Sequence, residues 1–298
     1  MTINFKPLSS LDFPILLKWL EMPHVKLWWD PEIKWTAELI EEKYSSYAHG
    51  YKIEKGKKKE IFAFIIYSND VPIGYIQVYN AHDFLDDELL KDLPESLASF
   101  DIFIGEKEYL FKNFGSKALK AFFEEHFTQK YKYVLASTDY KNMAAINSYR
   151  KSGFTIIEEE SASRGFLAIK NLEADKKVKD FLISYKNASL QKDIEPYLDH
   201  FSYPCFLKTQ NKNLFLERKE LKIIMSDLMK AWFDRGLVDG ILDIIEISYF
   251  SDKIIQVHAN WFAVNKNNQI FTSFESIYQL NIDKNNQLKI YNLTNLSA

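Results

Sequence analysis

The chain has 298 residues, of which 47% are hydrophobic and 15% aromatic, so its length favours two domains with well-filled cores. Its 38 Lys and Arg residues against 41 Asp and Glu residues give a net charge of −3, which argues against a dedicated nucleic-acid-binding protein. The single cysteine, Cys205, excludes an internal disulfide and has no Cys or His neighbour at zinc spacing, so we expect no metal site and a half-buried thiol.

The N-terminal segment lacks the pattern of a signal peptide. No apolar run approaches the ~20 residues that a membrane-spanning helix needs. We therefore expect a soluble, cytoplasmic protein that binds neither a membrane nor nucleic acid.

The first 80 residues predict a strand, two helices and a hairpin. We expect a strand at 3–7, a helix at 9–21 and a second helix at 38–47. Two strands at 60–67 and 73–79 are joined by an Asn-Asp-Val-Pro turn. The lysine-rich stretch before them, residues 52–59, is typical of a solvated basic turn.

An acidic segment, residues 83–95, follows the hairpin. It contains six acidic residues against one lysine: Asp83, Asp86, Asp87, Glu88, Asp92 and Glu95. Its leucines recur at helical spacing and predict an amphipathic surface helix with these side chains inward: Leu85, Leu89, Leu90 and Leu93. A cluster of acids also attracts polycations and raises their rate of association.

The remainder of the first domain alternates strands and helices around one sheet. We expect strands at 101–104, 133–137, 154–159 and 166–170, with helices at 114–127 and 143–152. The charged, aperiodic stretch 171–179 predicts the domain boundary, which gives domains at 1–172 and 173–298.

The second domain predicts helices followed by an antiparallel meander. The expected helices are 176–187, 191–200 and 218–234, and the expected strands are 241–249, 253–264, 269–282 and 287–293. This order resembles the nuclear-transport-factor-like, or SnoaL-like, cone fold. In such a cone, His258, Asn260 and Tyr278 are candidate ligand-lining residues. The expected fold class is thus α+β: a mixed sheet flanked by helices, then a smaller α+β domain with a curved antiparallel sheet.

Four segments of the first domain carry the strongest resemblance to a known family: Trp19–Trp29, Pro72–Gln77, Phe100–Glu106 and Asn142–Phe154. In this order they resemble the GCN5-related N-acetyltransferases (GNAT), of the aminoglycoside 6′-N-acetyltransferase type. The third segment is an apolar strand that leads through a glycine-containing turn into a helix, and helix N-termini bind anions through unpaired N–H groups. The resemblance implies that the pyrophosphate of acetyl-CoA, the cosubstrate, binds there.

The resemblance also implies site residues. Asp101 faces the substrate amine as the proton acceptor, and Tyr149 protonates the leaving thiolate. The cofactor would contact Ile102, Phe103, Ile104, Lys112, Asn113, Phe114, Gly115, Ser116, Asn142 and Tyr149. The substrate would contact Trp28, Trp29, Gln77, Asp101 and Asp139. From the residues alone, Asp101 also suits the start of a strand, while Tyr149, Trp28 and Trp29 also suit a core.

Two stretches depart from the family pattern. The turn 110–115 has Leu where Arg or Gln is usual and Asn113 in place of the first glycine. Because Asn tolerates left-handed backbone better than most residues, we expect the turn to survive. The loop 138–142 is shorter than in the family, so the role of Asp139 carries over less well than that of Asn142.

We therefore expect an acetyl-CoA-dependent N-acetyltransferase that acts by direct attack of a primary amine on a small cationic, aminoglycoside-like substrate, as enzymes of antibiotic resistance do. Three alternatives stay open. The acceptor is a siderophore precursor, it is a protein amine, or the domain is a non-catalytic acyl-CoA-binding module. A homodimer is compatible with the sequence.

Overall fold

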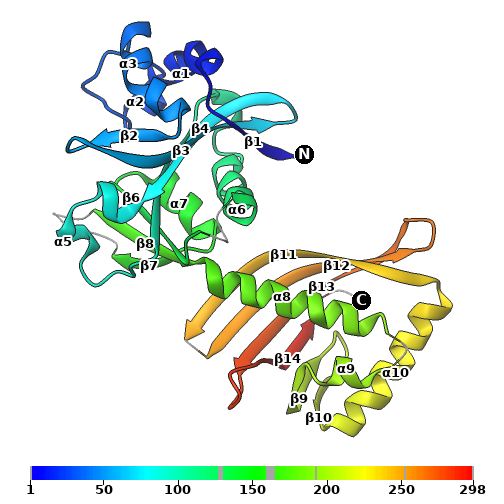
Figure 1. Cartoon of the computed structure of the whole chain (residues 1–298). Helices are drawn as coiled ribbons and strands as arrows, with labels where there is room; N and C mark the ends of the chain where they lie inside the picture. The colour runs from blue at the N-terminus through cyan, green and yellow to red at the C-terminus, as the bar shows by residue number, and fades with distance from the viewer. Residues whose placement is uncertain (1, 127–129, 159–164, 192, 252, 297–298) are drawn as a thin grey trace. The chain divides into compact units, whose positions relative to one another are not determined.

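The computed structural model describes residues 2–126, 130–158, 165–191, 193–251 and 253–296. The chain divides into two compact units, Met1–Glu173 and Ala174–Ala298 (Figure 1). Residues 127, 159 and 192, which belong to predicted elements, lie outside the described residues. In the described ranges, no helix is both long and apolar enough to cross a membrane.

The first unit is built on a mixed sheet. Among the described residues it has eight strands in the order β1-β3-β4-β5-β6-β8-β7, with β2 paired to β3. The strands are β1 (Ile3–Pro7), β2 (Tyr51–Glu54), β3 (Lys57–Ser68), β4 (Val71–Asn80), β5 (Leu97–Ile104), β6 (Tyr133–Thr138), β7 (Thr155–Glu158) and β8 (Phe166–Asn171). The predicted mixed sheet is confirmed. The basic stretch 52–59 is wrong as a turn, because most of it pairs as β2 and β3 around Lys55 and Gly56.

Helices cover both faces of this sheet. They are α1 (Phe13–Leu20), α2 (Pro23–Lys26), α3 (Ala37–Ala48), α4 (Ala81–Phe84), α5 (Asp87–Leu90), α6 (Phe114–His126) and α7 (Met143–Lys151), with 3-10 turns η1 (Ser10–Asp12) and η2 (Lys107–Tyr109). Tyr75 and Ile76 show how the faces divide, because successive strand residues point to opposite sides. Tyr75 packs in one core with residues of α1 and α3, and Ile76 packs in another with residues of α6 and α7.

The acidic segment 83–95 is not one helix. It forms two separate short turns, α4 and α5, and the second begins after an extended residue, Asp86. The prediction about its leucines is nevertheless confirmed. Leu90 is buried, and Leu85, Leu89 and Leu93 are partly buried against the same small core. Asp83 is half-buried and pairs with Lys59, whereas Asp86, Glu88, Asp92 and Glu95 are exposed.

The two parallel strands at the centre of the sheet separate. β5 pairs with β4 along the whole stretch from Ala98 to Ile104, but it pairs with β6 only over Leu97–Ser99. Beyond Ser99, the described residues include no ladder partner on that side for the backbone of β5. The strands thus open toward the end of β5, and α6 begins beyond that end.

The second unit contains a six-stranded mixed sheet, counted over its described residues, in the order β10-β9-β14-β13-β12-β11. Its strands are β9 (Phe201–Lys208), β10 (Asn213–Leu216), β11 (Leu237–Ser251), β12 (Ile254–Asn265), β13 (Ile270–Ile282) and β14 (Leu288–Asn295). Its helices are α8 (Leu172–Ser189), which begins two residues before the unit, α9 (Glu195–Leu198) and α10 (Arg218–Asp234). The four predicted meander strands and the helix 218–234 are confirmed.

The stretch 171–179, where the domain boundary is predicted, lies mostly in α8, which begins at Leu172 directly after β8. Two predictions for the second unit are wrong. The helix predicted at 191–200 is reduced in the described residues to the single turn α9. Strands β9 and β10 were missed, and they place Cys205 in the core, where it is 1% exposed rather than half-buried.

Candidate active site

A partly buried carboxylate lies at the centre of the first unit. On β5, Asp101 and Phe103 point to one face of the sheet, and Phe103 belongs to the core that α1 and α3 complete. Ile102 and Ile104 point to the other face and pack against the core of α6 and α7. Asp101 is thus the acidic position on an otherwise apolar strand, turned toward the helices α1–α3.

A chain of hydrogen bonds holds the Asp101 carboxylate. Gln77, directly opposite on β4, donates from Nε2 to Asp101 Oδ2 at 2.6 Å. The buried Tyr75 hydroxyl donates to Gln77 Oε1 at 2.8 Å and so fixes the orientation of the amide. Burial raises the pKa of the Asp101 carboxyl above its ordinary value, and hydrogen bonds from Gln77 and Tyr79 lower it in part. The carboxylate is therefore a stronger proton acceptor than a solvated Asp.

This carboxylate opens into a cavity of about 600 Å³. The predicted substrate residues Trp28, Trp29, Gln77 and Asp101 all line it. Trp28 is 42% exposed, whereas the ring of Trp29 packs edge-on against Phe103 with the centroids 5.0 Å apart. The fold therefore brings together four residues from three segments that are far apart in the chain.

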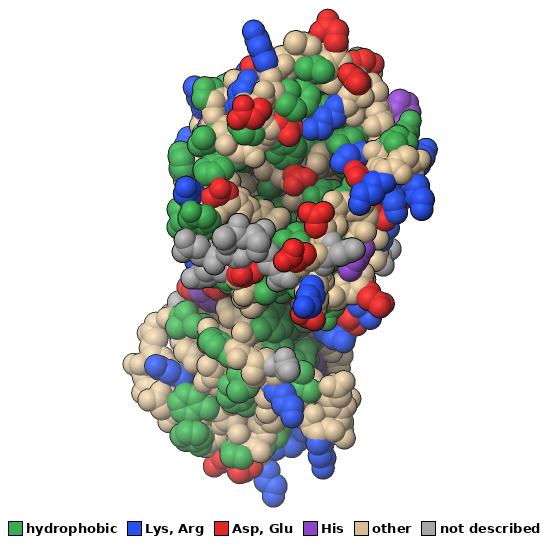
Figure 2. All heavy atoms as spheres, turned by 90° about the vertical axis from the view of Figure 1, so that its left-hand side faces the viewer, with side chains coloured by type: hydrophobic (Ala, Val, Ile, Leu, Met, Phe, Trp, Pro, Cys, Tyr) green, Lys and Arg blue, Asp and Glu red, His purple; other side chains and the backbone are tan. Residues whose placement is uncertain are grey.

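Charged residues that sequence reasoning missed complete the cavity. They are Asp30, Glu42, Lys43 and Lys52. Lys43 donates to Asp30 Oδ2 at 2.8 Å, so this pair is largely neutral within the cavity. Glu42 and Lys43 lie on the charged side of the amphipathic helix α3. In a sequence, such a side predicts a solvated surface rather than a cavity. Figure 2 views the molecule from the side where β2 and α5 lie in Figure 1 and shows acidic and basic side chains together on this face of the first unit.

The predicted pyrophosphate turn is intact at the start of α6. Asn113 has φ +63°, the left-handed conformation that the usual glycine would adopt, and its side chain accepts a 2.6 Å hydrogen bond from Lys151 Nζ. Ser116 donates from Oγ to the Asn113 carbonyl, so its hydroxyl is engaged and its N–H is the group left for an anion. Lys112 and Lys117 bring further positive charge to the turn. The region fits the pyrophosphate of a coenzyme A ester.

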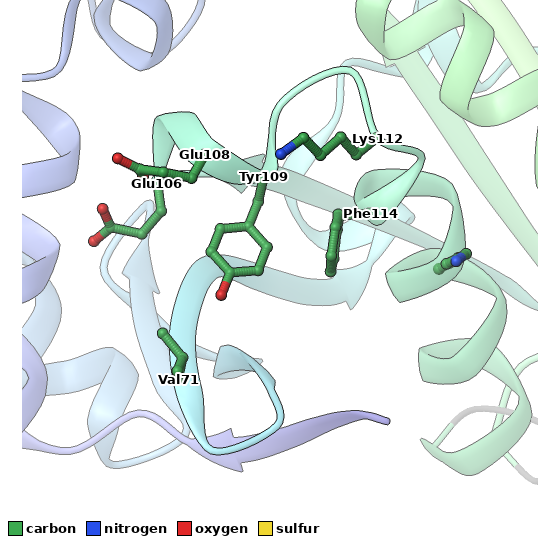
Figure 3. Close-up of a pocket in the computed structure, with 7 residues that line it drawn as sticks. Val71, Glu106, Glu108, Tyr109, Lys112 and Phe114 are labelled. Carbon is green, nitrogen blue, oxygen red and sulfur yellow. The ribbon is translucent and has the colours of Figure 1, made fainter. Parts of the chain in front are cut away.

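Beside this turn lies a further cavity of about 680 Å³ (Figure 3). Tyr109 and Phe114 form its apolar wall, with ring centroids 4.7 Å apart, and the Lys112 side chain reaches over them. Phe114 is buried in the core, so its backbone N–H is the group that remains for a cofactor contact. The acids Glu106 and Glu108 make this side of the turn less favourable for phosphate.

Asn142 directly precedes α7, and Tyr149 lies on it. Asn142 is the N-cap: its Oδ1 accepts the Ala145 N–H at 3.2 Å and its Nδ2 donates to Thr138 Oγ1 at 3.2 Å. Tyr149 is 6% exposed and packs edge-on against Phe100, with centroids 5.7 Å apart. Burial, and secondarily the charge of Asp101, raises its pKa above the ordinary value. Its hydroxyl therefore stays protonated at neutral pH.

Asp139 lies apart from the cavity around Asp101, which we call the acceptor cavity. Its exposed carboxylate accepts the backbone N–H of Lys141 at 2.7 Å and closes the short loop before α7. It is absent from the described lining of the cavity around Asp101. A substrate contact by Asp139 stays a prediction.

Residues 9–161 match the family described as acetyltransferase (GNAT) domain. The fold also resembles solved structures of the aminoglycoside acetyltransferase AAC(6′)-Ib. Its complex with paromomycin and acetyl-CoA aligns with a TM-score of 0.51 and 21% identity over 60% of this chain and 98% of that one. Its complex with ribostamycin and coenzyme A gives a TM-score of 0.51, 22% identity and the same shares of the two chains.

Proposed function

The chain belongs to the GNAT acetyltransferase family, and on that premise we propose that it transfers acetyl from acetyl-CoA to a primary amine of a small cationic, aminoglycoside-like substrate. One observation carries this proposal. Asp101 is a partly buried carboxylate with a raised pKa, and it faces a cavity lined by Trp28 and Trp29. A carboxylate among aromatic rings suits the capture of an ammonium group.

In the proposed reaction the amine attacks the thioester carbon directly. The substrate amine has a pKa near ~10, so it arrives as an ammonium and must lose a proton before it attacks. Asp101, held by Gln77, accepts that proton directly or through one water. The raised pKa of Asp101 brings its basicity closer to neutral pH and so favours this transfer.

The tetrahedral oxyanion would be stabilised by the backbone N–H groups of Ile102 and Ile104, which point away from β4 to the side where β5 has left its ladder with β6. When the C–S bond breaks, the thiolate takes the proton of the Tyr149 hydroxyl. The attacking nitrogen loses its second proton as the amide forms, Tyr149 regains a proton from solvent, and Asp101 releases its proton to solvent. The products are the N-acetyl amine, coenzyme A and one proton, and no group besides the two substrates is consumed.

The cosubstrate would be held by the turn at the start of α6. The N–H groups of Asn113 to Ser116 and the cations Lys112 and Lys151 would contact its pyrophosphate. Asn142 would contact the pantetheine arm. The complexes of AAC(6′)-Ib with acetyl-CoA and an aminoglycoside make this pairing the first to test.

The test measures release of coenzyme A from acetyl-CoA with a panel of amines: several aminoglycosides, spermidine, N-hydroxylysine, lysine and a basic peptide. Turnover on aminoglycosides that falls at least ~100-fold in Asp101→Asn, with acetyl-CoA binding retained, supports the proposal. Turnover on another amine only would support the proposed mechanism but assign a different substrate. Activity of Asp101→Asn within a few-fold of wild type would overturn the role of Asp101.

For the second unit we propose the nuclear-transport-factor-like cone fold. Its order of helices and strands supports this, with α8 and α9 before the first hairpin and α10 before the long meander. The parallel pairing of β9 with β14 joins the first hairpin to the end of the meander in one sheet.

A further inference from the structure

The second unit contains a cavity of its own, of about 330 Å³. It lies between one face of the six-stranded sheet and the helices α8 and α10; α8 runs across the strands in Figure 1 and packs on them through Tyr185 and Trp261. Protein interiors have few voids larger than a water molecule. This volume equals that of roughly ten waters, so the space is too large to be a packing defect.

The walls of this cavity are aromatic and aliphatic. Phe274 stacks between two tryptophans: its centroid is 5.3 Å from that of Trp232 and 6.3 Å from that of Trp261, with interplanar angles of 28° and 14°. Met225, Leu228 and other apolar side chains of α10 line the other side. An apolar cavity of this kind stays dry and binds apolar molecules, and parallel ring faces favour a planar one.

One buried end of the cavity is polar. Tyr185 and Tyr197 share a 2.6 Å hydrogen bond between their hydroxyls, and the Tyr185 hydroxyl also lies against that of Tyr278. Trp261 Nε1 lies beside Tyr278 but has no hydrogen-bond partner among the described residues, although Trp261 is only 6% exposed. A buried N–H without an acceptor costs about 1–3 kcal/mol. All four residues line the cavity, so this end offers a spare donor.

The exposed rim of the cavity is cationic. Arg235, which follows α10, is exposed and lines the cavity, with its guanidinium over the ring of Phe271. Lys186 also lines it and donates to Asp239 Oδ1 at 3.2 Å. The described residues show no ion pair for Arg235, so its charge is available to an anionic group at the opening.

We propose that this cavity binds a small, planar, mostly apolar molecule that carries a hydrogen-bonding oxygen at its inner end and an anionic group at its outer end. The oxygen accepts from Trp261 Nε1, and the anion lies near Arg235. Of the residues that the sequence suggested for this unit, Tyr278 lines the cavity, whereas His258 instead pairs with Glu275. This inference does not depend on the proposed acetyl transfer, because its test measures binding alone.

The probe is 6-hydroxy-2-naphthoate, with 2-naphthoate as the analogue that lacks the inner oxygen. In full-length protein with 15N-labelled tryptophan, the six indole N–H signals are followed by NMR during titration, and that of Trp261 is assigned from its loss in Trp261→Phe. We expect saturable binding, a shift of the Trp261 signal, and about tenfold tighter binding of the hydroxylated probe. A hydrogen bond worth ~1.4 kcal/mol gives this factor.

Trp261→Phe keeps an aromatic side chain, smaller than the indole, and removes the N–H, so the two probes should then bind with equal affinity. Trp35→Phe is the matched control, because Trp35 Nε1 is also buried without a partner but lies in the first unit. It should bind both probes like wild type. Arg235→Gln should weaken both probes several-fold. Should Trp261→Phe fail to fold, Tyr278→Phe, which removes the hydroxyl beside Trp261 Nε1, assigns the Trp261 signal by its shift, and the wild-type titration then tests the proposal. No saturable binding below 5 mM, or binding that leaves the Trp261 signal unmoved, overturns the proposal.

Discussion

Gln77 and Asp101 occupy directly opposing positions on β4 and β5, and the amide donates to the carboxylate at 2.6 Å. Because Tyr75 holds the amide oxygen, the donor end of Gln77 is the end turned to Asp101. This arrangement stabilises the ionised carboxylate inside a site whose burial disfavours it. The protonation of Asp101 is thus set by two opposing effects that mutations can separate.

The first prediction concerns the pH dependence of catalysis. Asp101 accepts a proton only when ionised, so kcat/KM should fall as the pH falls through its raised pKa. Gln77→Leu removes a donor to the ionised form, which raises that pKa further and moves the acidic limb of the profile to higher pH. Initial rates from pH 5 to 9 measure this.

Tyr75→Phe is the matched control for Gln77→Leu, because it frees the amide but leaves the donor in place. Its acidic limb should move in the same direction by less. Ionisation of the substrate amine affects all variants alike, so the comparison between variants isolates Asp101. A limb that moves to lower pH in Gln77→Leu contradicts the arrangement.

The second prediction concerns stability. The pKa of Asp101 is higher in the folded protein than in the unfolded chain, so the folded protein binds the proton more tightly. The free energy of unfolding therefore decreases as the pH rises from the unfolded-state pKa through the folded-state pKa. Asp101→Asn removes the effect and should raise Tm by a few degrees at pH 7. The gain should vanish at pH 3, where the wild-type carboxyl is protonated in both states.

Thermal unfolding of wild type and Asp101→Asn at the two pH values provides the measurement. Asp70→Asn, in the exposed β3–β4 turn, is the control and should change stability by less than ~0.5 kcal/mol at either pH. A lower Tm for Asp101→Asn at pH 7 would show that the carboxylate stabilises the fold. The expected result is instead a variant that gains stability as it loses turnover.

The third prediction separates the hydroxyl of Tyr149 from its ring. Tyr149→Phe keeps the packing against Phe100 and Phe166 but removes the proton donor for the thiolate, so kcat should fall about 100-fold. Its stability should change little, whereas Tyr149→Ala should cost ~3–5 kcal/mol because it empties a core position. Steady-state kinetics and denaturant unfolding test both. Full activity in Tyr149→Phe would leave Tyr149 as a core aromatic only.

Much of the first unit could be predicted because its signals are local. The apolar strand around Asp101 interrupts its own pattern with one acid, and Asn142 marks the start of α7 by capping it. The acceptor cavity was only half predicted. Lys43 and Lys52 line it together with Gln77 and Asp101, which lie farther along the chain, and nothing in their local sequence distinguishes them from solvated lysines.

In the second unit, too, elements that depend on contacts between distant segments could not be predicted. β9 pairs in parallel with β14, about ninety residues later, so its stability comes from contacts that no local window contains. Its sequence also includes Pro204, which argues against a strand with neighbours on both sides. The helix α10, by contrast, has both predicted ends, because its apolar stripe and its first-turn Glu220 are local features.

The fourth prediction concerns the role of Gly115. A Cβ at this position would lie 3.2 Å from Ser148 Oγ on α7, closer than most real contacts. Gly115→Ala should therefore displace the start of α6 and raise the Kd for coenzyme A about tenfold, measured by calorimetry. The double variant Gly115→Ala with Ser148→Ala relieves the contact and should restore binding. Binding that stays weak in the double variant would show that the glycine serves the approach of the pyrophosphate instead.

The fifth prediction distinguishes two adjacent tryptophans. Trp28 is 42% exposed at the acceptor cavity, so Trp28→Ala should raise KM for the amine about tenfold and leave stability unchanged. Trp29 packs against Phe103 and Tyr75, so Trp29→Ala should cost ~3–5 kcal/mol of unfolding free energy. Kinetics with the best amine of the panel and guanidinium unfolding measure the two effects. If Trp28→Ala instead lowers stability and spares KM, both tryptophans belong to the core and the cavity binds its substrate through charge alone.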